Sequence, residues 1–169
     1  MFSVPTMIDY LRSGWVISLS VAIDFTASNG ELSEPGSLHY IDPHDPNKMT
    51  AYEQAIFQVG NILEPYDHNK QFPVFGFGAK PRFMGWNDVS HCFHLNGKED
   101  PEVQGVSGIL AAYRQAMQGG IGLYGPTNFS PCLKTMIEIV RSRAQMAEYN
   151  IMLYITDGAI TDMDDTINR

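Results

Sequence analysis

Two aspartates, Asp24 and Asp157, each follow a run of apolar residues in the sequence. Asp24 comes directly after the letters VAI, and Asp157 comes after IMLYIT. In an open α/β sheet, ligands bind outside the carboxyl ends of the strands, at the point where the strand order reverses. Aspartates are also common as helix caps and turn residues, so these two on their own leave both interpretations open.

The residues that follow Asp24 favour a cation site. Asp24, Thr26 and Ser28 occupy alternate positions, and on an extended segment alternate side chains share a face. Their oxygens are therefore expected to converge. Carboxylate and hydroxyl oxygens are hard ligands that suit Mg²⁺, Mn²⁺ or Ca²⁺ rather than zinc. Because Mg²⁺ retains several waters, a few protein ligands suffice to hold it.

The charge of this set predicts binding rather than catalysis. Two carboxylates neutralise a divalent ion, and neutral hydroxyls leave it able to accept one more anionic ligand. We expect that ligand to be an acidic side chain of a protein partner. No base and nucleophile stand together near these residues, so we expect no enzymatic activity.

An alternative is a magnesium-dependent phosphotransferase or phosphatase built on a similar sheet, because fold alone does not fix function. Such enzymes with an aspartyl nucleophile usually carry another acid two residues later. This chain has Thr26 at that position, which disfavours the alternative.

The histidines do not indicate a second metal site. On a strand, the residues His91 and His94 would face opposite sides, because they are three positions apart. His39, His44 and His68 lie in polar or loop segments.

Hydrophobic patterning predicts strands that alternate with helices. Strands buried on both faces are expected over 15–23, 72–78 and 151–155, and an antiparallel edge strand over 89–95. Helices are expected over 6–13, 49–64, 106–117 and 131–147, with a long loop over 29–48. Gly76 and Gly78 are expected to permit close approach of the backbone. This alternation indicates an α/β fold with a doubly wound, mostly parallel open sheet and one antiparallel edge strand.

One domain is expected over residues 15–169, preceded by a leader helix or linker over 1–14. The acidic cluster Asp162–Asp165 is typical of the solvated first turn of a helix. That helix has no room to finish before Arg169, so we expect a fragment that is truncated at its C-terminus.

Composition limits the binding partners and the cellular compartment that we expect for the protein. The net charge of −8 disfavours unaided binding to nucleic acid or to an anionic membrane. The two cysteines, Cys92 and Cys132, stand in no metal or redox spacing and are expected to be free, mostly buried thiols. With neither a signal peptide nor an apolar run of about 20 residues, we expect a cytoplasmic protein.

The strings VAIDFTASNG, SLHY, FPVFGFGA, YGPTNFSP and ITDG, in this order, resemble the copine family across nearly the whole chain. The resemblance implies a von Willebrand A domain with a metal-ion-dependent adhesion site of the DxSxS type, in its threonine variant. It implies Asp24, Thr26, Ser28 and Thr127 as direct or near ligands of the ion. It also implies Asp157 as an acid that often acts through water.

Copines carry two N-terminal C2 domains that bind phospholipid in response to calcium, and nothing in this chain resembles a C2 domain. The resemblance therefore implies that membrane binding, and calcium-dependent recruitment to the plasma membrane, belong to another part of the parent protein. A RING-type ubiquitin ligase with a copine-like A domain is a further alternative. The letters ASNG, which directly follow Asp24-Phe25-Thr26, favour a copine.

Overall fold

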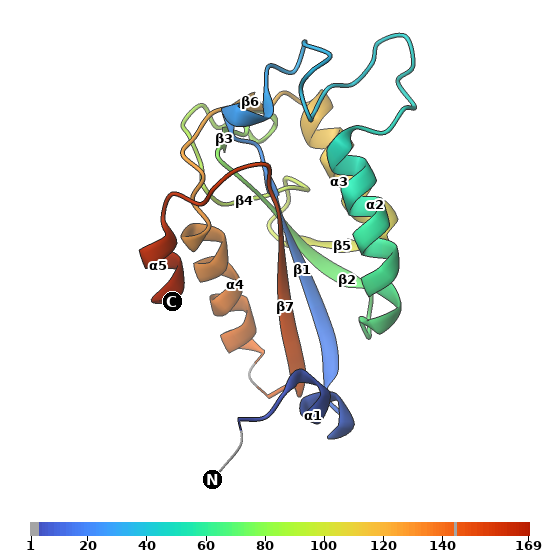
Figure 1. Cartoon of the computed structure of the whole chain (residues 1–169), viewed down its shortest axis with the longest axis vertical. Helices are drawn as coiled ribbons and strands as arrows, with labels where there is room; N and C mark the ends of the chain where they lie inside the picture. The colour runs from blue at the N-terminus through green and yellow to red at the C-terminus, as the bar shows by residue number, and fades with distance from the viewer. Residues whose placement is uncertain (1–3, 144) are drawn as a thin grey trace.

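The computed structural model describes residues 4–143 and 145–169, and it is built around a mixed five-stranded sheet. The strand β1 (Val16–Asp24) lies in the middle of the sheet, and β7 (Glu148–Ile155) runs parallel to it on one side (Figure 1). On the other side of β1 lies β2 (Gln71–Phe77), also parallel. Two short antiparallel strands, β4 (Phe93–His94) and β5 (Glu102–Gln104), pair with β2.

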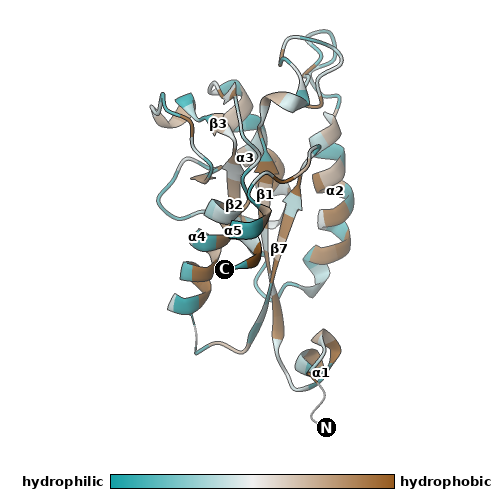
Figure 2. Ribbon diagram, turned by 60° about the vertical axis from the view of Figure 1, so that its left-hand side comes forward, coloured by the Kyte–Doolittle hydropathy of each residue, from teal (hydrophilic) through white to brown (hydrophobic). Residues whose placement is uncertain are grey.

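Helices cover both faces of this sheet. On one face lie α2 (Ala51–Leu63) and α3 (Gly105–Gln118), and on the other lies α4 (Ser130–Ser142) (Figures 1 and 2). The smaller helices are α1 (Met7–Arg12) and α5 (Met163–Ile167). A separate two-stranded ribbon joins β3 (Ala79–Lys80) to β6 (Gly122–Leu123). The structure thus confirms the predicted α/β fold with a doubly wound, mostly parallel sheet, as in von Willebrand A-like domains.

The order of the strands creates a switch point at the carboxyl end of β1. The chain leaves β1 through α2 to reach β2 on one side, and later enters β7 on the other side after α4. The segments that follow β1 and β7 therefore diverge over opposite faces of the sheet. This is where open α/β sheets bind ligands.

Alternate residues of the strands form two apolar layers. Leu19, Val21 and Ile23 of β1 pack with the helices α2 and α3, while Ala22 faces the α4 side with Phe75. Period-two alternation explains this division, because successive side chains of a strand point to opposite faces.

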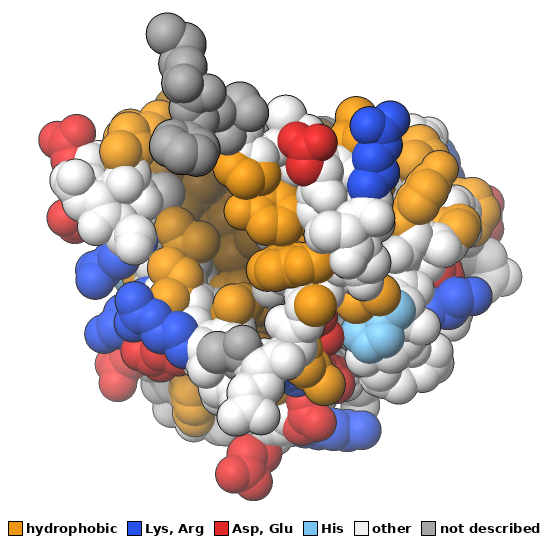
Figure 3. Space-filling model, turned by 90° about the horizontal axis from the view of Figure 1, so that it is seen from below, with side chains coloured by type: hydrophobic (Ala, Val, Ile, Leu, Met, Phe, Trp, Pro, Cys, Tyr) orange, Lys and Arg blue, Asp and Glu red, His pale blue; other side chains and the backbone are white. Residues whose placement is uncertain are grey.

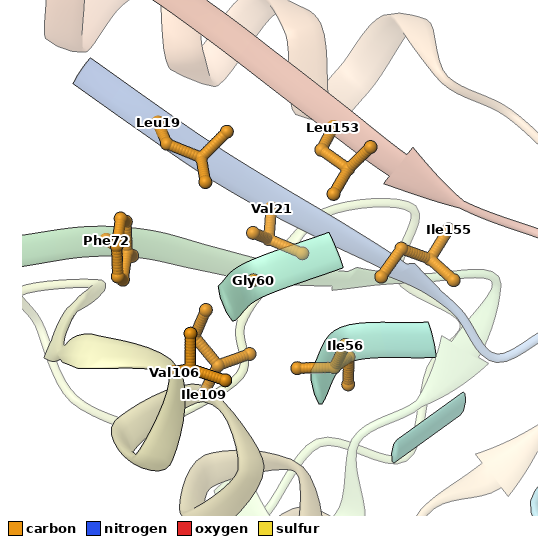
Figure 4. Close-up of a pocket in the computed structure, with 9 residues that line it drawn as sticks. All are labelled: Leu19, Val21, Ile56, Gly60, Phe72, Val106, Ile109, Leu153 and Ile155. Carbon is orange, nitrogen blue, oxygen red and sulfur yellow. The ribbon is translucent and has the colours of Figure 1, made fainter. Parts of the chain in front are cut away.

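The layer under α2 and α3 is packed with almost no free space. Figure 4 shows its lining, which is entirely apolar and brings Gly60 of α2 against Val106 of α3. The interior room is about 10 Å³, close to the smallest space that holds one water. The hollow therefore belongs to the core and is too small for a ligand.

The predicted edge strand over 89–95 is wrong in extent. Only Phe93–His94 forms a strand, and β5, which the patterning missed, occupies the rest of that edge. Ser90 explains the shortening, because its hydroxyl bonds the carbonyl oxygen (2.9 Å) and the amide (3.3 Å) of Cys92. Such local bonds hold the backbone in a turn and compete with strand pairing.

The helix predicted over 131–147 is also too long, because α4 ends at Ser142. The chain must then cross to the start of β7. The carbonyl of Ala147 already accepts a bond from the amide of Val16 on β1. Residues before β7 are therefore committed to the sheet and cannot continue the helix.

Apolar side chains gather around a hollow at the end of the molecule that carries α1 (Figure 3). The aromatic ring of Tyr10 lies 4.8 Å from that of Trp15 and 5.7 Å from that of Tyr149 in β7. Helix α1 is thus packed on the amino end of β7, and the loops after β1 and β7 lie at the opposite end. Within the described residues, none of the helices has the length and apolarity to cross a bilayer.

Candidate cation site

Asp24 ends β1 with its side chain fully buried. Its Oδ1 accepts the Thr26 amide at 2.7 Å and the Thr26 hydroxyl at 2.6 Å. Its Oδ2 accepts the hydroxyl of Thr156, which follows β7, at 2.5 Å. A buried carboxylate is costly unless such donors surround it. Asp24 therefore has the turn role that the sequence left open.

Thr26 and Ser28 continue the line of oxygens. Thr26 Oγ1 lies 2.9 Å from Ser28 Oγ, and Ser28 Oγ donates to Asp157 Oδ1 at 3.1 Å. The expectation of one extended segment is wrong beyond Thr26, because residues Ala27–Asn29 form a turn of 3₁₀ helix. That turn folds Ser28 back, so the three side chains converge for a different reason than alternation on a strand.

The hydroxyl protons in this line are fewer than the contacts between its oxygens. Thr26 and Ser28 carry one hydroxyl proton each, while the line has three contacts: Thr26 with Asp24, Thr26 with Ser28 at 2.9 Å, and Ser28 with Asp157. Either hydroxyl could donate in the Thr26–Ser28 contact, so two protons serve three contacts and one contact has none. Oxygens that face one another without a proton are what a cation stabilises, so this donor set fits a metal ion.

Thr127 approaches from the loop between β6 and α4. Tyr124 in that loop forms a parallel bridge with Thr26, and its carbonyl accepts the amide of Ala27. The Thr127 side chain is buried. A β-carbon built on Gly158 would lie 3.8 Å from Thr127 Oγ1 and 3.9 Å from Ser28 Oγ. Both hydroxyls therefore face the same side of the loop after β7.

Asp157 lies in that loop and is exposed, as is Ser28. Asp24 and Thr26 form a buried floor beneath them. The structure thus brings Asp24, Thr26, Ser28 and Asp157 into one chain of hydrogen bonds, with Thr127 beside it. Among the described residues no cluster of three or more His, Cys, Asp and Glu side chains forms a metal site. Two carboxylates with three hydroxyls instead make an all-oxygen set, which suits Mg²⁺.

Gly78 allows the backbone to pass close to Thr26, as the sequence suggested. Its φ of +73° is in the left-handed region, and a β-carbon there would lie 2.3 Å from Thr26 Cγ2. A glycine at this position is required by both the conformation and the space. Gly76 is similarly confined, because a β-carbon would lie 2.4 Å from the ring of Phe93.

Sequence reasoning missed two polar residues that support the floor. Thr156 was read only as part of a strand end. Asn29 lies at the start of the predicted loop over 29–48, yet it is buried, and its amide donates to the carbonyl of Thr26 at 3.0 Å. The Oδ1 of Asn29 in turn accepts the hydroxyl of Tyr52 in α2 at 2.7 Å.

His39 is the largest omission. It lies in the long loop but is fully buried, stacked on the rings of Phe25 and Tyr52 at 4.9 and 4.2 Å between centroids. Burial lowers the pKa of His39 to about 4, although the carbonyl and the charge of Asp24 act in the opposite direction. The imidazole is therefore neutral at pH 7. A loop histidine gives no sequence signal of such burial.

Neutrality fixes the direction of a chain of hydrogen bonds. The carbonyl of Asp24 can only accept, so His39 Nε2 donates to it at 2.9 Å. His39 Nδ1 must then accept the hydroxyl of Tyr113, which lies 2.8 Å away in α3. Tyr113 accepts from the hydroxyl of Thr50 at 3.1 Å, the residue that caps α2. Asp24 is thus tied to α2 and α3 through its main chain.

Asp162 has a structural role that the sequence interpretation missed. It was expected in a solvated helix start, but its carboxylate accepts the amides of Phe129 (2.8 Å) and Ser130 (2.9 Å) at the start of α4. A carboxylate at this end of a helix satisfies free amides and complements the helix dipole. Asp164 and Asp165 are exposed, as expected.

The fold and these side chains define a domain of the von Willebrand A type, with an oxygen-rich site at the carboxyl end of its central strands. The family model described as Copine matches residues 37–169. Protein BONZAI 2 and Protein BONZAI 1 of Arabidopsis thaliana are each 46% identical to this chain over 164 residues, which cover 95% of its length. The chain belongs to the copine family. It spans 27% of the length of these two relatives.

Proposed function

We propose that this chain is a protein-interaction module that binds Mg²⁺ through Asp24, Thr26, Ser28, Thr127 and Asp157. The single observation that carries the proposal is the line of oxygens from Asp24 to Asp157, in which three contacts share only two hydroxyl protons. A divalent cation would relieve the contact that lacks a proton, and the two carboxylates would balance its charge. Mn²⁺ or Ca²⁺ would meet the same oxygen ligands.

The bound ion would leave a position for an acidic side chain of a protein partner. Ser28 and Asp157 are exposed at the rim of the site, so the ion would be reachable from solvent. The neutral hydroxyls do not repel an incoming carboxylate, whereas additional acids would. We therefore propose a binding role and no catalytic role for this chain.

The longer parent protein is a separate part of the proposal. Because the chain belongs to the copine family, we infer that its parent binds phospholipid in a calcium-dependent manner through C2 domains outside this chain. The A domain would then recruit target proteins to the plasma membrane from the cytoplasm. The phospholipid binding is not assigned to the residues of this chain.

Mg²⁺ titration of the purified chain by calorimetry tests the cation site. Asp157→Asn is the informative variant, because Asp157 is exposed and its loss leaves the buried floor in place. We expect it to weaken Mg²⁺ binding by at least about tenfold, the scale on which groups around a metal act. Asp164→Asn is the matched control, since it removes an equally exposed acid from α5 and should leave the affinity unchanged.

Equal Mg²⁺ affinity in wild type and Asp157→Asn would contradict the site. The partner role has its own test on a peptide array, probed with the chain in Mg²⁺ and again in EDTA. Peptides that bind only with Mg²⁺ should lose binding when one acidic residue becomes its amide. Mg²⁺-dependent binding that survives every such replacement would contradict the acidic ligand and leave the cation site intact.

A further inference from the structure

Cys92 and Cys132 are separated by 39 intervening positions in the sequence but lie together beside β2. The thiol of Cys132 donates to the carbonyl of His91 at 3.3 Å, and His91 directly precedes Cys92. The thiol of Cys92 reaches the hydroxyl of Thr135 at 3.4 Å, one turn of α4 after Cys132. Two contacts thus cross between the same two short segments.

The two thiols differ in access. Cys132 is fully buried under the sheet. Cys92 is only partly buried and lines an open groove of about 370 Å³, together with Trp86, His94 and Thr135. A small oxidant can therefore approach Cys92 from solvent, while Cys132 has no exposed surface.

The surroundings also shift the pKa values of the two thiols in opposite directions. A thiolate at Cys92 accepts hydrogen bonds from Cys132 and Thr135, which hold the pKa of Cys92 below its usual value against the effect of burial. Burial raises the pKa of Cys132, and its bond to Cys92 raises it further. The thiolate is the nucleophilic form of cysteine. Reaction is therefore directed to Cys92, with Cys132 held as a thiol next to it.

We propose that Cys92 and Cys132 form an oxidant-sensitive pair, in which Cys92 reacts with a hydroperoxide and Cys132 converts the product to a disulfide. With hydrogen peroxide, the Cys92 thiolate attacks one oxygen, the O–O bond breaks, and Cys92 sulfenic acid and hydroxide form. The sulfur of Cys132 then attacks the sulfur of Cys92. The S–O bond breaks, and the departing hydroxide takes up the Cys132 proton as water. The disulfide sulfurs have lost two electrons, and the peroxide has gained them.

The disulfide would join the segment before β4 to the first turn of α4. Cys132 follows Thr127 by five positions, so the bridge would restrain the loop that carries this candidate ligand. This consequence rests on the proposed function and is measured separately, as the Mg²⁺ affinity of the oxidised chain. A chain that binds no Mg²⁺ in either state would contradict the cation site but not the thiol pair.

The test treats the reduced 169-residue chain with hydrogen peroxide and follows intact mass after alkylation in denaturant. We expect loss of the mass of two hydrogen atoms, no alkylation, and a monomer on a non-reducing gel. Because the chain has only two cysteines, a disulfide within one molecule must join this pair. The lowered pKa of Cys92 favours the first step and the proximity of Cys132 favours the second, so disulfide formation should be at least about tenfold faster in the folded chain than in urea.

Two variants assign the roles. Cys132→Ser should stop at Cys92 sulfenic acid, trapped as a dimedone adduct, and Cys92→Ser should leave Cys132 unoxidised in the folded chain. Disulfides only between molecules, or equal rates in folded and unfolded wild type, would overturn the proposal. The rate comparison needs no variant, so it stands even where Cys132→Ser does not fold.

Discussion

The carboxylate of Asp24 keeps its place through residues that are distant in the sequence. Thr156, 132 positions away, donates to one oxygen, while Thr26 donates to the other through both its amide and its hydroxyl. A donor lost from a buried carboxylate costs more than the bond alone, since the carboxylate is left short of partners. The site therefore depends on the positions of these side chains.

Gly78→Ala tests this dependence. The new methyl would lie 2.3 Å from Thr26 Cγ2, and alanine would be forced to a φ of +73°. We expect a loss of about 2–4 kcal/mol in the free energy of unfolding from the strained backbone and the overpacking, and weaker Mg²⁺ binding because Thr26 must move. Urea unfolding and calorimetry measure the two effects.

Gly36→Ala is the control, because no atom lies within 4 Å of its added methyl. It should change the free energy of unfolding by less than about 0.5 kcal/mol. Should Gly78→Ala be as stable as this control, the close approach to Thr26 would be wrong.

At the scale of elements, the contact between α2 and α3 depends on one small residue. Gly60 of α2 faces Val106 at the start of α3, as Figure 4 shows. A β-carbon on Gly60 would lie 2.6 Å from Val106 Cγ2 and 3.0 Å from Cγ1. Valine is β-branched and has little rotamer freedom with which to yield. The two helices therefore approach as closely as glycine permits.

Gly60→Ala sets two effects against each other. Alanine is favoured over glycine within a helix by about 1 kcal/mol, but overpacking costs about 1–3 kcal/mol. We expect a net loss in the free energy of unfolding, measured by urea denaturation. Asn61→Ala, at the next and exposed position, should show only a small gain.

A second variant separates the two effects. In a Val106→Ala background the clash is gone, so Gly60→Ala should become stabilising there. A loss of the same size in both backgrounds would show that the contact with Val106 is not its cause.

At the scale of the whole molecule, His39 joins the sheet to both helices on one face. Its bonds reach Asp24 in β1 and Tyr113 in α3, and Tyr113 reaches the cap of α2. This series of hydrogen bonds, from Thr50 through Tyr113 and His39 to the carbonyl of Asp24, requires a neutral imidazole. Protonation would place a buried charge in it and leave Tyr113 without its acceptor.

The global stability should therefore depend on pH through His39. Its pKa is about 4 in the folded chain against an ordinary value of 6.5, so the unfolded chain binds the proton more readily between these values. The stabilisation is fully present above pH 6.5 and is lost as the pH falls towards 4. The difference of pKa corresponds to about 3 kcal/mol.

Urea unfolding between pH 7 and pH 4, in metal-free buffer with EDTA, measures this loss. His39→Gln supplies a donor amide that does not titrate in this range, so its stability should fall by about 3 kcal/mol less over the same interval. Parallel pH dependences of the two proteins would contradict a buried neutral His39.

The sequence alone determined the α/β class and the three long parallel strands, because runs of apolar residues mark the strands of a covered sheet. The prediction that 151–155 is buried on both faces is wrong, because β7 ends the strand order among the described residues and is only partly buried. The sequence also singled out Asp24, Thr26, Ser28 and Asp157, since residue type and strand ends are local properties. It did not locate the limits of the edge strands. There a few local bonds, such as those of Ser90, outweigh the pattern of apolar residues.

Only the tertiary structure decided how the candidate ligands meet and what holds them. The 3₁₀ turn that folds Ser28 back, the burial of His39 and the capping of α4 by Asp162 depend on segments that are remote in the chain. A loop histidine and a surface-like aspartate have the same local signature whether they are exposed or buried. The physical reason is that burial and hydrogen-bond partners arise from packing between distant elements, which no local pattern of residues encodes.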